Sequence, residues 1–286
     1  MADSGPEIVT TVAALRQRVS GWRQQSRIVG LVPTMGALHD GHAALVRRSI
    51  EQSDRTIVSI FVNPTQFSPS EDFETYPRDE DADLALLEEL GADLVYMPAP
   101  DQMYADGFST GVSVSGITQG LCGASRPHFF GGVATVVTKL LLQGLPDFAY
   151  FGEKDYQQLR VVSRMVRDLD IPVSIVGVPT VREDDGLALS SRNAYLSPDE
   201  RDVAPVLHRT LQEVGERLRG GDAADAAAAW GHEQLSKAGF DPIDYLEVCD
   251  PQTLEPLTGS LPTGGTARIL AAAFLGKTRL IDNIST

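Results

Sequence analysis

The chain has few cysteines and no long apolar run, and each shortage excludes a class of protein. Its 286 residues include only two cysteines, Cys122 and Cys249, which are far apart and lack the spacing of metal ligands. A disulfide framework or a zinc site is therefore not expected. No apolar run approaches the roughly 20 residues of a membrane span, and residues 1–7 lack the basic and apolar regions of a signal peptide. We expect a cytoplasmic protein with buried cysteines and no membrane partner.

Basic residues are also scarce. Lys and Arg number 24 against 39 Asp and Glu, which gives a formal net charge of −15 at pH 7. Such a charge disfavours a protein that coats nucleic acid, so an anionic ligand must be held by a few local cations. Hydrophobic residues make up 42% of the chain, as is usual for a globular protein, and the length favours one large domain with a smaller companion.

Strand and helix patterns alternate over the first part of the chain. Because alternation of this kind builds a parallel sheet, residues 1–181 are predicted to form a Rossmann-like, doubly wound α/β domain. Residues 182–286 carry two helical segments and then three strand candidates, which predicts a small α+β domain. The expected strands are 28–32, 55–62, 93–97, 147–151, 173–178, 243–248, 267–274 and 279–281, with a further β-rich stretch at 109–115.

The most informative segment follows the first long apolar strand. Residues 32–42 read VPTMGALHDGH, which places His39 and His42 three positions apart where a helix should begin. On a helical turn the two rings share a face beside free backbone N–H groups, at the end of the helix that attracts phosphate. Gly41 leaves room for a ligand to approach the backbone. Two ordinary loop histidines are the alternative, which the preceding strand disfavours.

Two further polar segments follow strand ends. In the first, NPTQF, Asn63 and Gln66 can donate and accept hydrogen bonds, which suits a small hydroxy acid, although a simple Asn-Pro turn is the alternative. In the second, GEKDYQQ at 152–158, Lys154 offers a charge to phosphate and Asp155 can accept hydrogen bonds from ribose hydroxyls. A polar turn between strand and helix is the alternative there.

A last polar segment, LALSSRN at 187–193, follows an acidic stretch at 183–185. Two hydroxyls and an arginine can neutralise a departing phosphate group, and an exposed polar loop is the alternative. Ligands bind at the carboxyl ends of strands in such sheets. We therefore expect the segments that begin with His39, Asn63 and Gly152 to meet in one crevice.

These four motifs occur in the order found in pantothenate synthetases, the pantoate–β-alanine ligases, and the chain resembles that family from Val32 to Asn283. The family belongs to the HxGH nucleotidyltransferases related to class I aminoacyl-tRNA synthetases. The resemblance implies ATP-dependent condensation of (R)-pantoate with β-alanine through a pantoyl adenylate, with release of AMP and pyrophosphate. It also implies Mg²⁺, a homodimer and a C-terminal domain that covers the active site. The alternatives are a related nucleotidyltransferase that transfers AMP to a phosphate ester, and a non-catalytic nucleotide-binding protein.

The resemblance also implies a role for individual residues. His39, His42 and Lys154 are expected to be catalytic, with His42 protonating a phosphate oxygen. Gln66, Gln158 and Asn63 are expected to bind pantoate, and Gln66 to border the β-alanine site. Val181 is expected to pack against the adenine. The expected ATP site comprises Met35, Gly36, Ala37, Leu38, His39, Asp40, Gly41, His42, Gly152, Glu153, Lys154, Asp155, Val181, Leu189, Ser190, Ser191 and Arg192.

Two segments leave their assignments open. In residues 126–133, His128 stands one position before the histidine of the family pattern, so Arg126 and His128 are left out of the catalytic set. The acidic residues Asp79, Glu80, Asp81 and Asp83 fit a solvated helix start, because carboxylates favour the first turn of a helix. One or two of them could help to place Mg²⁺, but no metal ligand is assigned.

Overall fold

The computed structural model describes residues 5–67, 73–262 and 264–286, and the chain divides into two compact units. The first comprises Met1–Val114, His128–Glu153 and Val161–Pro179, and the second comprises Ser115–Pro127, Lys154–Arg160 and Thr180–Thr286. A domain boundary at residue 181 stays a prediction. Residues 1–4, on which the expected lack of a targeting segment partly rests, lie outside the described residues.

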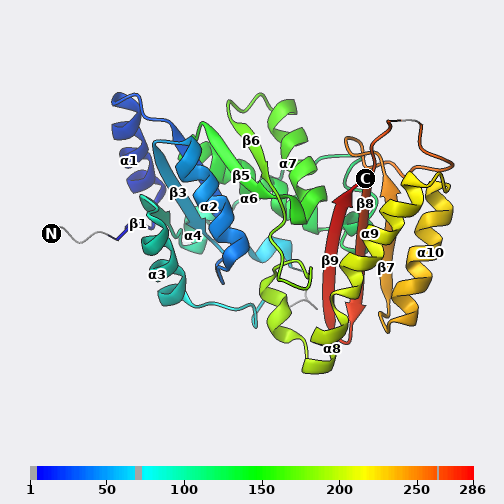
Figure 1. The fold of residues 1–286 in the computed structure, drawn as a ribbon. Helices are drawn as coiled ribbons and strands as arrows, with labels where there is room; N and C mark the ends of the chain where they lie inside the picture. Colours follow the sequence, from blue (N-terminus) through cyan, green and yellow to red (C-terminus); the bar gives the residue numbers. More distant parts are fainter. Residues whose placement is uncertain (1–4, 68–72, 263) are drawn as a thin grey trace. The chain divides into compact units, whose positions relative to one another are not determined.

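The first unit is built on a six-stranded sheet in which every neighbouring pair is parallel (Figure 1). The strand order is β1-β4-β3-β2-β5-β6, which confirms the predicted Rossmann-like sheet. β1 was not expected, because three residues are too few to show a pattern. The strands are β1 (Glu7–Val9), β2 (Val29–Thr34), β3 (Arg55–Ile60), β4 (Leu94–Tyr96), β5 (Phe148–Gly152) and β6 (Ser174–Val178).

Helices cover both faces of this sheet. On one face, α2 contacts β2, β3, β5 and α3, around a core that includes Val46, Val58 and Leu87. On the other, α6 contacts α1 and β2, and the Thr138 hydroxyl of α6 lies 2.9 Å from the Met165 sulfur of α7. The helices are α1 (Val12–Gln24), α2 (Asp40–Gln52), α3 (Glu80–Leu90), α4 (Pro100–Met103), α6 (Phe129–Gly144) and α7 (Tyr156–Asp168).

The sheet brings three strand ends side by side. β2 pairs with β3 on one side and with β5 on the other. The last residues of β2 and β3, Thr34 and Ile60, lie opposite each other. The segments that begin with His39, Asn63 and Gly152 each leave the carboxyl end of one of these strands. The order of the strands thus places the starts of three predicted motifs along one edge of the sheet.

The second unit contains a three-stranded antiparallel sheet in the order β7-β8-β9, which confirms the predicted α+β organisation. α9 packs on β8 and β9, while α10 packs on β7 and on α9. Leu211, Val214 and Ile269 are fully buried between them. The elements are α5 (Cys122–Ser125), α8 (Pro198–Val203), α9 (Val206–Arg219), α10 (Ala224–Lys237), β7 (Ile243–Cys249), β8 (Arg268–Leu275) and β9 (Thr278–Ser285).

The structure corrects one expected element. Residues 109–115 form no strand, although their alternation of Val with polar residues suggested one. The backbone N–H of Val112 donates instead to the Thr135 hydroxyl of α6, 3.0 Å away. A short alternating stretch becomes a strand only where another strand pairs with it. Among the described residues no strand pairs with 109–115, and the sequence alone could not show this.

Two expectations about the chain as a whole can also be compared with the structure. Cys122 and Cys249 are both free and buried, as expected, and burial raises the pKa of the Cys249 thiol to about 12. Within residues 5–67, 73–262 and 264–286, no helix has the length and apolar character needed to cross a membrane.

Candidate active site

The side chains of His39 and His42 each accept a hydrogen bond from a backbone N–H group at the start of α2. His39 is the N-cap, and its Nδ1 accepts a hydrogen bond from Gly41 N at 3.1 Å. The Nδ1 of His42 accepts from His39 N at 3.3 Å, and the two ring centroids are 4.2 Å apart. A ring nitrogen that accepts a hydrogen bond carries no proton, so each neutral ring has its proton on Nε2. This arrangement selects the Nε2–H tautomer, a donor, in both histidines.

The turn before α2 is held by a carboxylate from α3. Gly36 and Ala37 have φ angles of 81° and 51°, and the N–H groups of Ala37 and Leu38 donate to the two Asp83 oxygens at 2.9 and 2.7 Å. Burial raises the pKa of Asp83, although both backbone bonds favour its ionised form. Because these two amides are bound to Asp83, a contact of Ala37 or Leu38 with ATP would have to use other atoms.

The interpretation of the acidic stretch as a solvated helix start is therefore wrong for Asp83. Asp79 fits it, because this residue is the N-cap of α3 and accepts from Ala82 N at 3.1 Å. Asp83 is only 4% exposed and holds the turn before α2 in place. Sequence position could not show this difference, since the partners of Asp83 lie 45 and 46 residues earlier in the chain.

Asn63 organises the loop after β3, a one-turn helix labelled η1 (Pro64–Gln66). Its side chain is fully buried, and its amide donates to Gln66 Oε1 at 3.0 Å and to Gly132 O at 3.2 Å. Its oxygen accepts from the Thr65 hydroxyl at 3.0 Å and from the Tyr104 hydroxyl at 2.8 Å. These bonds turn Gln66 so that its Oε1 faces Asn63, which leaves the donor end of the Gln66 amide facing away from Asn63.

Two residues that support this loop escaped sequence reasoning. Tyr104 follows α4 and donates to Asn63, and burial raises the pKa of its hydroxyl. Gly132 lies in the first turn of α6, where an added Cβ would be 2.4 Å from the backbone oxygen of Thr65. The glycine therefore allows α6 and the loop to touch. His128, by contrast, is an exposed residue just before α6 and makes no side-chain cap bond to it.

The segment after β5 places a lysine, which could bind phosphate, next to a carboxylate. Gly152 is the last residue of β5, and a one-turn helix, η2 (Glu153–Asp155), leads into α7. Lys154 Nζ lies 3.6 Å from the Asp155 carboxylate, and the Lys154 side chain is 20% exposed. The backbone oxygen of Lys154 accepts a hydrogen bond at 2.8 Å from the side-chain amide of Asn283 in β9.

Two adjacent glutamines of α7 have different environments. Gln157 is buried and donates to Ile117 O and Gly120 O at 3.0 and 2.9 Å, while its own oxygen accepts from Cys122 N at 3.0 Å. It therefore fixes the loop before α5. Gln158, the expected pantoate ligand, points in another direction because successive helical residues are about 100° apart, and it is half-buried.

The expected adenine and pyrophosphate segment forms a braced hairpin over residues 181–189. Leu189 N donates to Val181 O at 3.0 Å, and Gly186 provides the turn with a φ of 95°. Arg201 of α8 binds Glu183 and Asp185, each at 2.6 Å, and this arginine holds the pKa of Asp185 below its usual value. The acidic stretch before the motif thus braces the hairpin.

The hairpin is also tied to β9 by a buried ion pair. Both terminal nitrogens of Arg182 bind Asp282, at 2.7 and 2.8 Å, and one also donates to Gly186 O at 3.0 Å. His208 Nδ1 lies 3.2 Å from Asp282, a close contact without the alignment of a hydrogen bond. Burial by itself would raise the pKa of Asp282, but His208 and Arg182 outweigh it and hold the pKa below its usual value.

The next residues of this motif lead into a third one-turn helix, η3 (Ser191–Tyr195). Its N-cap is Ser190, whose hydroxyl accepts from Arg192 N at 3.3 Å. Asn193 braces the same turn by donating to Glu183 and to Ala188 O at 3.3 and 3.1 Å. The motif is therefore an ordered turn rather than a loose polar loop.

The candidate residues fall in both units of the chain. His39, His42, Asn63 and Gln66 belong to the first unit, with Gly152. The second unit holds Lys154, Asp155, Gln158, Val181 and residues 189–192. The site assignments themselves stay predictions, and each unit supplies its own ordered set of polar groups.

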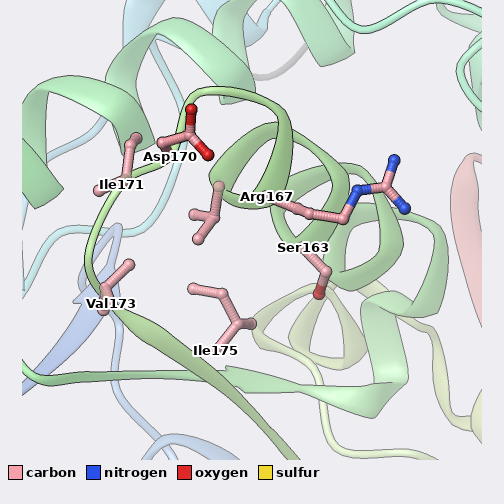
Figure 2. Close-up of a pocket in the computed structure, with 7 residues that line it drawn as sticks. Ser163, Arg167, Asp170, Ile171, Val173 and Ile175 are labelled. Atoms are coloured by element: carbon pink, nitrogen blue, oxygen red, sulfur yellow. The ribbon is translucent and has the colours of Figure 1, made fainter.

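A hollow in the first unit is not part of this set. Its volume is about 500 Å³, and it is lined by α7, by the segment leading into β6 and by the start of β6, including Arg167, Asp170 and Ile175 (Figure 2). It lies at the amino end of β6. Because ligands of such sheets bind at the carboxyl ends, the hollow is a poor candidate for the active site.

Within residues 5–67, 73–262 and 264–286, the structure offers few ligands for a protein-held metal ion. Among the described residues, no three His, Cys, Asp or Glu side chains are grouped so that they could hold one. Asp83 is engaged with backbone amides, and Asp155 lies beside Lys154. This donor set fits a Mg²⁺ ion held mainly by phosphate oxygens and water.

Comparison with known proteins gives a consistent result over the full length. The family model described as "Pantoate-beta-alanine ligase" matches residues 7–285. Curated proteins named pantothenate synthetase from Paramagnetospirillum magneticum and Rhodospirillum rubrum are 58% and 56% identical over 277 residues. These alignments cover 97% of this chain, and 96% and 98% of the relatives.

Solved structures agree with these matches. A pantothenate synthetase from Thermus thermophilus superposes with a TM-score of 0.90 at 50% identity and covers 97% of this chain and 98% of its own. A pantoate-beta-alanine ligase from Francisella tularensis, complexed with beta-gamma ATP and beta-alanine, superposes with a TM-score of 0.82 at 32% identity. That match covers 98% of this chain and 97% of the neighbour.

Proposed function

The chain belongs to the pantoate-beta-alanine ligase family, and from this premise we propose how its residues divide the work of the ligase. The enzyme condenses (R)-pantoate with β-alanine at the expense of ATP, through a pantoyl adenylate, and releases AMP and pyrophosphate. The match over nearly the whole chain is the observation that carries this conclusion. It also disfavours the alternative in which AMP is kept in the product, since the family is a ligase.

Adenylate formation requires alignment and charge neutralisation more than a base. The pantoate carboxylate is already ionised at neutral pH and attacks the α-phosphorus as pyrophosphate leaves. His39 and His42 bind the triphosphate through their Nε2–H groups at the N-terminus of α2, where the helix dipole also favours anions. His42 donates its Nε2–H to a phosphate oxygen in a hydrogen bond; to protonate that oxygen the ring must first become an imidazolium, which requires the bond from His39 N to its Nδ1 to open. Lys154 stabilises the phosphate charge.

Gln66 binds pantoate and borders the β-alanine site. Its support is the hydrogen bond from Asn63, which fixes the orientation of the Gln66 amide. Asn63 has its own amide committed to Gln66 and Gly132, so its part in pantoate binding is to orient Gln66. Gln158 provides a second amide from α7.

The second unit contributes the remaining ATP contacts. Val181 and Leu189, paired in the hairpin, pack against the adenine, while Ser190, Ser191 and Arg192 bind the leaving pyrophosphate. Asp155 accepts from the ribose hydroxyls, beside the close approach allowed by Gly152. Met35, Gly36, Asp40, Gly41 and Glu153 complete the proposed ATP site.

Three further properties are proposals of the same kind. Mg²⁺ accompanies ATP and is held by phosphate oxygens and water, as the sparse donor set supports. A second copy of the chain forms a homodimer with it, as the family resemblance implies. Sedimentation equilibrium tests this homodimer. A cytoplasmic location stays a prediction.

AMP release tests the proposed reaction. The protein is assayed with ATP, Mg²⁺, pantoate and β-alanine, and one component is omitted at a time. A pantoate-dependent exchange of labelled pyrophosphate into ATP without β-alanine, and AMP release only with β-alanine, are expected. AMP retained in an adenylylated product would identify the related nucleotidyltransferase activity, and ATP binding without turnover would identify a non-catalytic protein.

A further inference from the structure

Asn283 occupies a buried position in β9 from which it reaches the proposed phosphate-binding turn. Its side-chain nitrogen donates to the backbone oxygen of Lys154 at 2.8 Å, although the two residues are 129 positions apart. Its side-chain oxygen accepts from Arg268 Nε at 2.6 Å. Asn283 is 3% exposed and Arg268 is 9% exposed. Both ends of the amide are thus used, and the two bonds fix its orientation.

The partners of Asn283 are themselves held in place. The Arg268 guanidinium carbon lies 4.0 Å from the centre of the Tyr156 ring, and Tyr156 donates to Pro251 O at 3.0 Å. The backbone N–H of Asn283 donates to Asp282 at 2.7 Å. The amide that contacts Lys154 is therefore held by an arginine that is itself fixed by a stacking contact.

The same two residues of β9 reach both proposed ATP segments of the second unit. Asn283 holds the Lys154 turn, and Asp282 holds the hairpin through Arg182. These contacts lie within one compact unit. The Asp282–Asn283 pair therefore sets the spacing between the segment proposed for phosphate and the segment proposed for adenine.

We propose that Asn283 is a positioning residue for adenylate formation, and that it acts by fixing the backbone of Lys154. The proposal rests on the proposed role of Lys154. A lysine has four rotatable bonds, so its ammonium group reaches a defined phosphate oxygen only if its backbone is held still. Displacement by about 1 Å can cost on the order of 10²-fold in rate.

The variant Asn283→Asp isolates the donor function. The carboxylate keeps the size of the side chain and the acceptor for Arg268, but it places an oxygen opposite the Lys154 oxygen in place of an N–H donor. We expect the pantoate-dependent exchange of pyrophosphate into ATP to fall at least tenfold. Conversion of supplied pantoyl adenylate and β-alanine into pantothenate should stay within twofold, because pyrophosphate is already gone in that step.

Two variants separate this role from a general loss of stability. Leu280→Val changes a buried core residue of the same strand. It should lower the unfolding temperature without changing the ratio of the two half-reactions. Asn283→Ser removes the amide without adding a charge, and it should show the same selective loss of exchange if Asn283→Asp does not fold.

A double-mutant cycle decides the outcome. Lys154→Ala should lower exchange, and Asn283→Asp or Asn283→Ser in that background should add no further loss. Additive losses, or an equal loss in both half-reactions, would overturn the positioning role of Asn283. If Lys154→Ala leaves exchange unchanged, the proposed role of Lys154 fails, and the proposal that Asn283 acts through Lys154 fails with it. A loss of exchange in the single Asn283 variants would then show that Asn283 acts through another group.

Discussion

Replacing Gly132 by alanine tests whether α6 positions the loop that carries Gln66. The new Cβ would lie 2.4 Å from the backbone oxygen of Thr65 and 2.7 Å from its carbonyl carbon, whereas ordinary contacts begin at 3.4 Å. The helix or the loop must therefore move by about 1 Å. Asn63 moves with it, because its amide donates to Gly132 O and to Gln66.

Two effects of Gly132→Ala can be given a magnitude. Overpacking of this kind costs about 1–3 kcal/mol of stability. A displacement of about 1 Å in a substrate-positioning group can cost on the order of 10²-fold in rate. We expect kcat/KM for pantoate to fall by about 10–100-fold, with a much smaller change in the KM for ATP. Steady-state kinetics with each substrate varied in turn measures this difference.

Gly131 provides a matched control in the same helix. No atom lies within 4 Å of the Cβ that Gly131→Ala would add, and alanine gains about 1 kcal/mol over glycine in a helix. This variant should unfold at a slightly higher temperature and keep the pantoate kinetics of the parent enzyme. Unchanged pantoate kinetics in Gly132→Ala, or an equal loss in Gly131→Ala, would refute the reasoning.

The remaining predictions concern three other side chains. His42→Ala should slow adenylate formation by about 10²–10⁴-fold if His42 donates a proton; an unchanged rate in a single-turnover experiment would remove that role. Gln66→Ala should weaken pantoate and β-alanine far more than ATP, as measured by the three KM values, and an equal loss for all three would contradict its assignment. Asp282→Asn breaks a buried ion pair and should cost about 3–5 kcal/mol in urea denaturation at pH 7. Because the pKa of Asp282 is lower in the folded state than in the unfolded one, the pair contributes stability above the unfolded pKa, which is about 4, and this contribution is lost as the pH falls through the folded pKa. The parent should therefore lose more stability than the variant on acidification from pH 5, and parallel curves would count against the pairing.

The sequence predicted features that depend on neighbours along the chain. His39 and His42 could be placed at a helix start because strand, turn and helix follow one another within residues 28–52. The alternation of strands and helices was sufficient to predict the parallel sheet.

Features that depend on distant partners were missed. Asp83 has the sequence context of a surface residue, and only the fold brings it to the amides of Ala37 and Leu38. Asn283 and Lys154 are far apart in the chain, so no local pattern could connect them. Residues 109–115 have the alternation of a strand, but pairing is a property of the whole sheet and not of the segment.

The hydrogen bond from Asn63 to Gln66 has a consequence for substrate affinity. A glutamine side chain loses about 1.5–2 kcal/mol of rotamer entropy when it is immobilised. In this enzyme that loss occurs when the chain folds, since Gln66 is already held by Asn63 before any hydroxy acid arrives. If Gln66 binds pantoate as proposed, binding is spared the same cost, which corresponds to about tenfold or more in the dissociation constant.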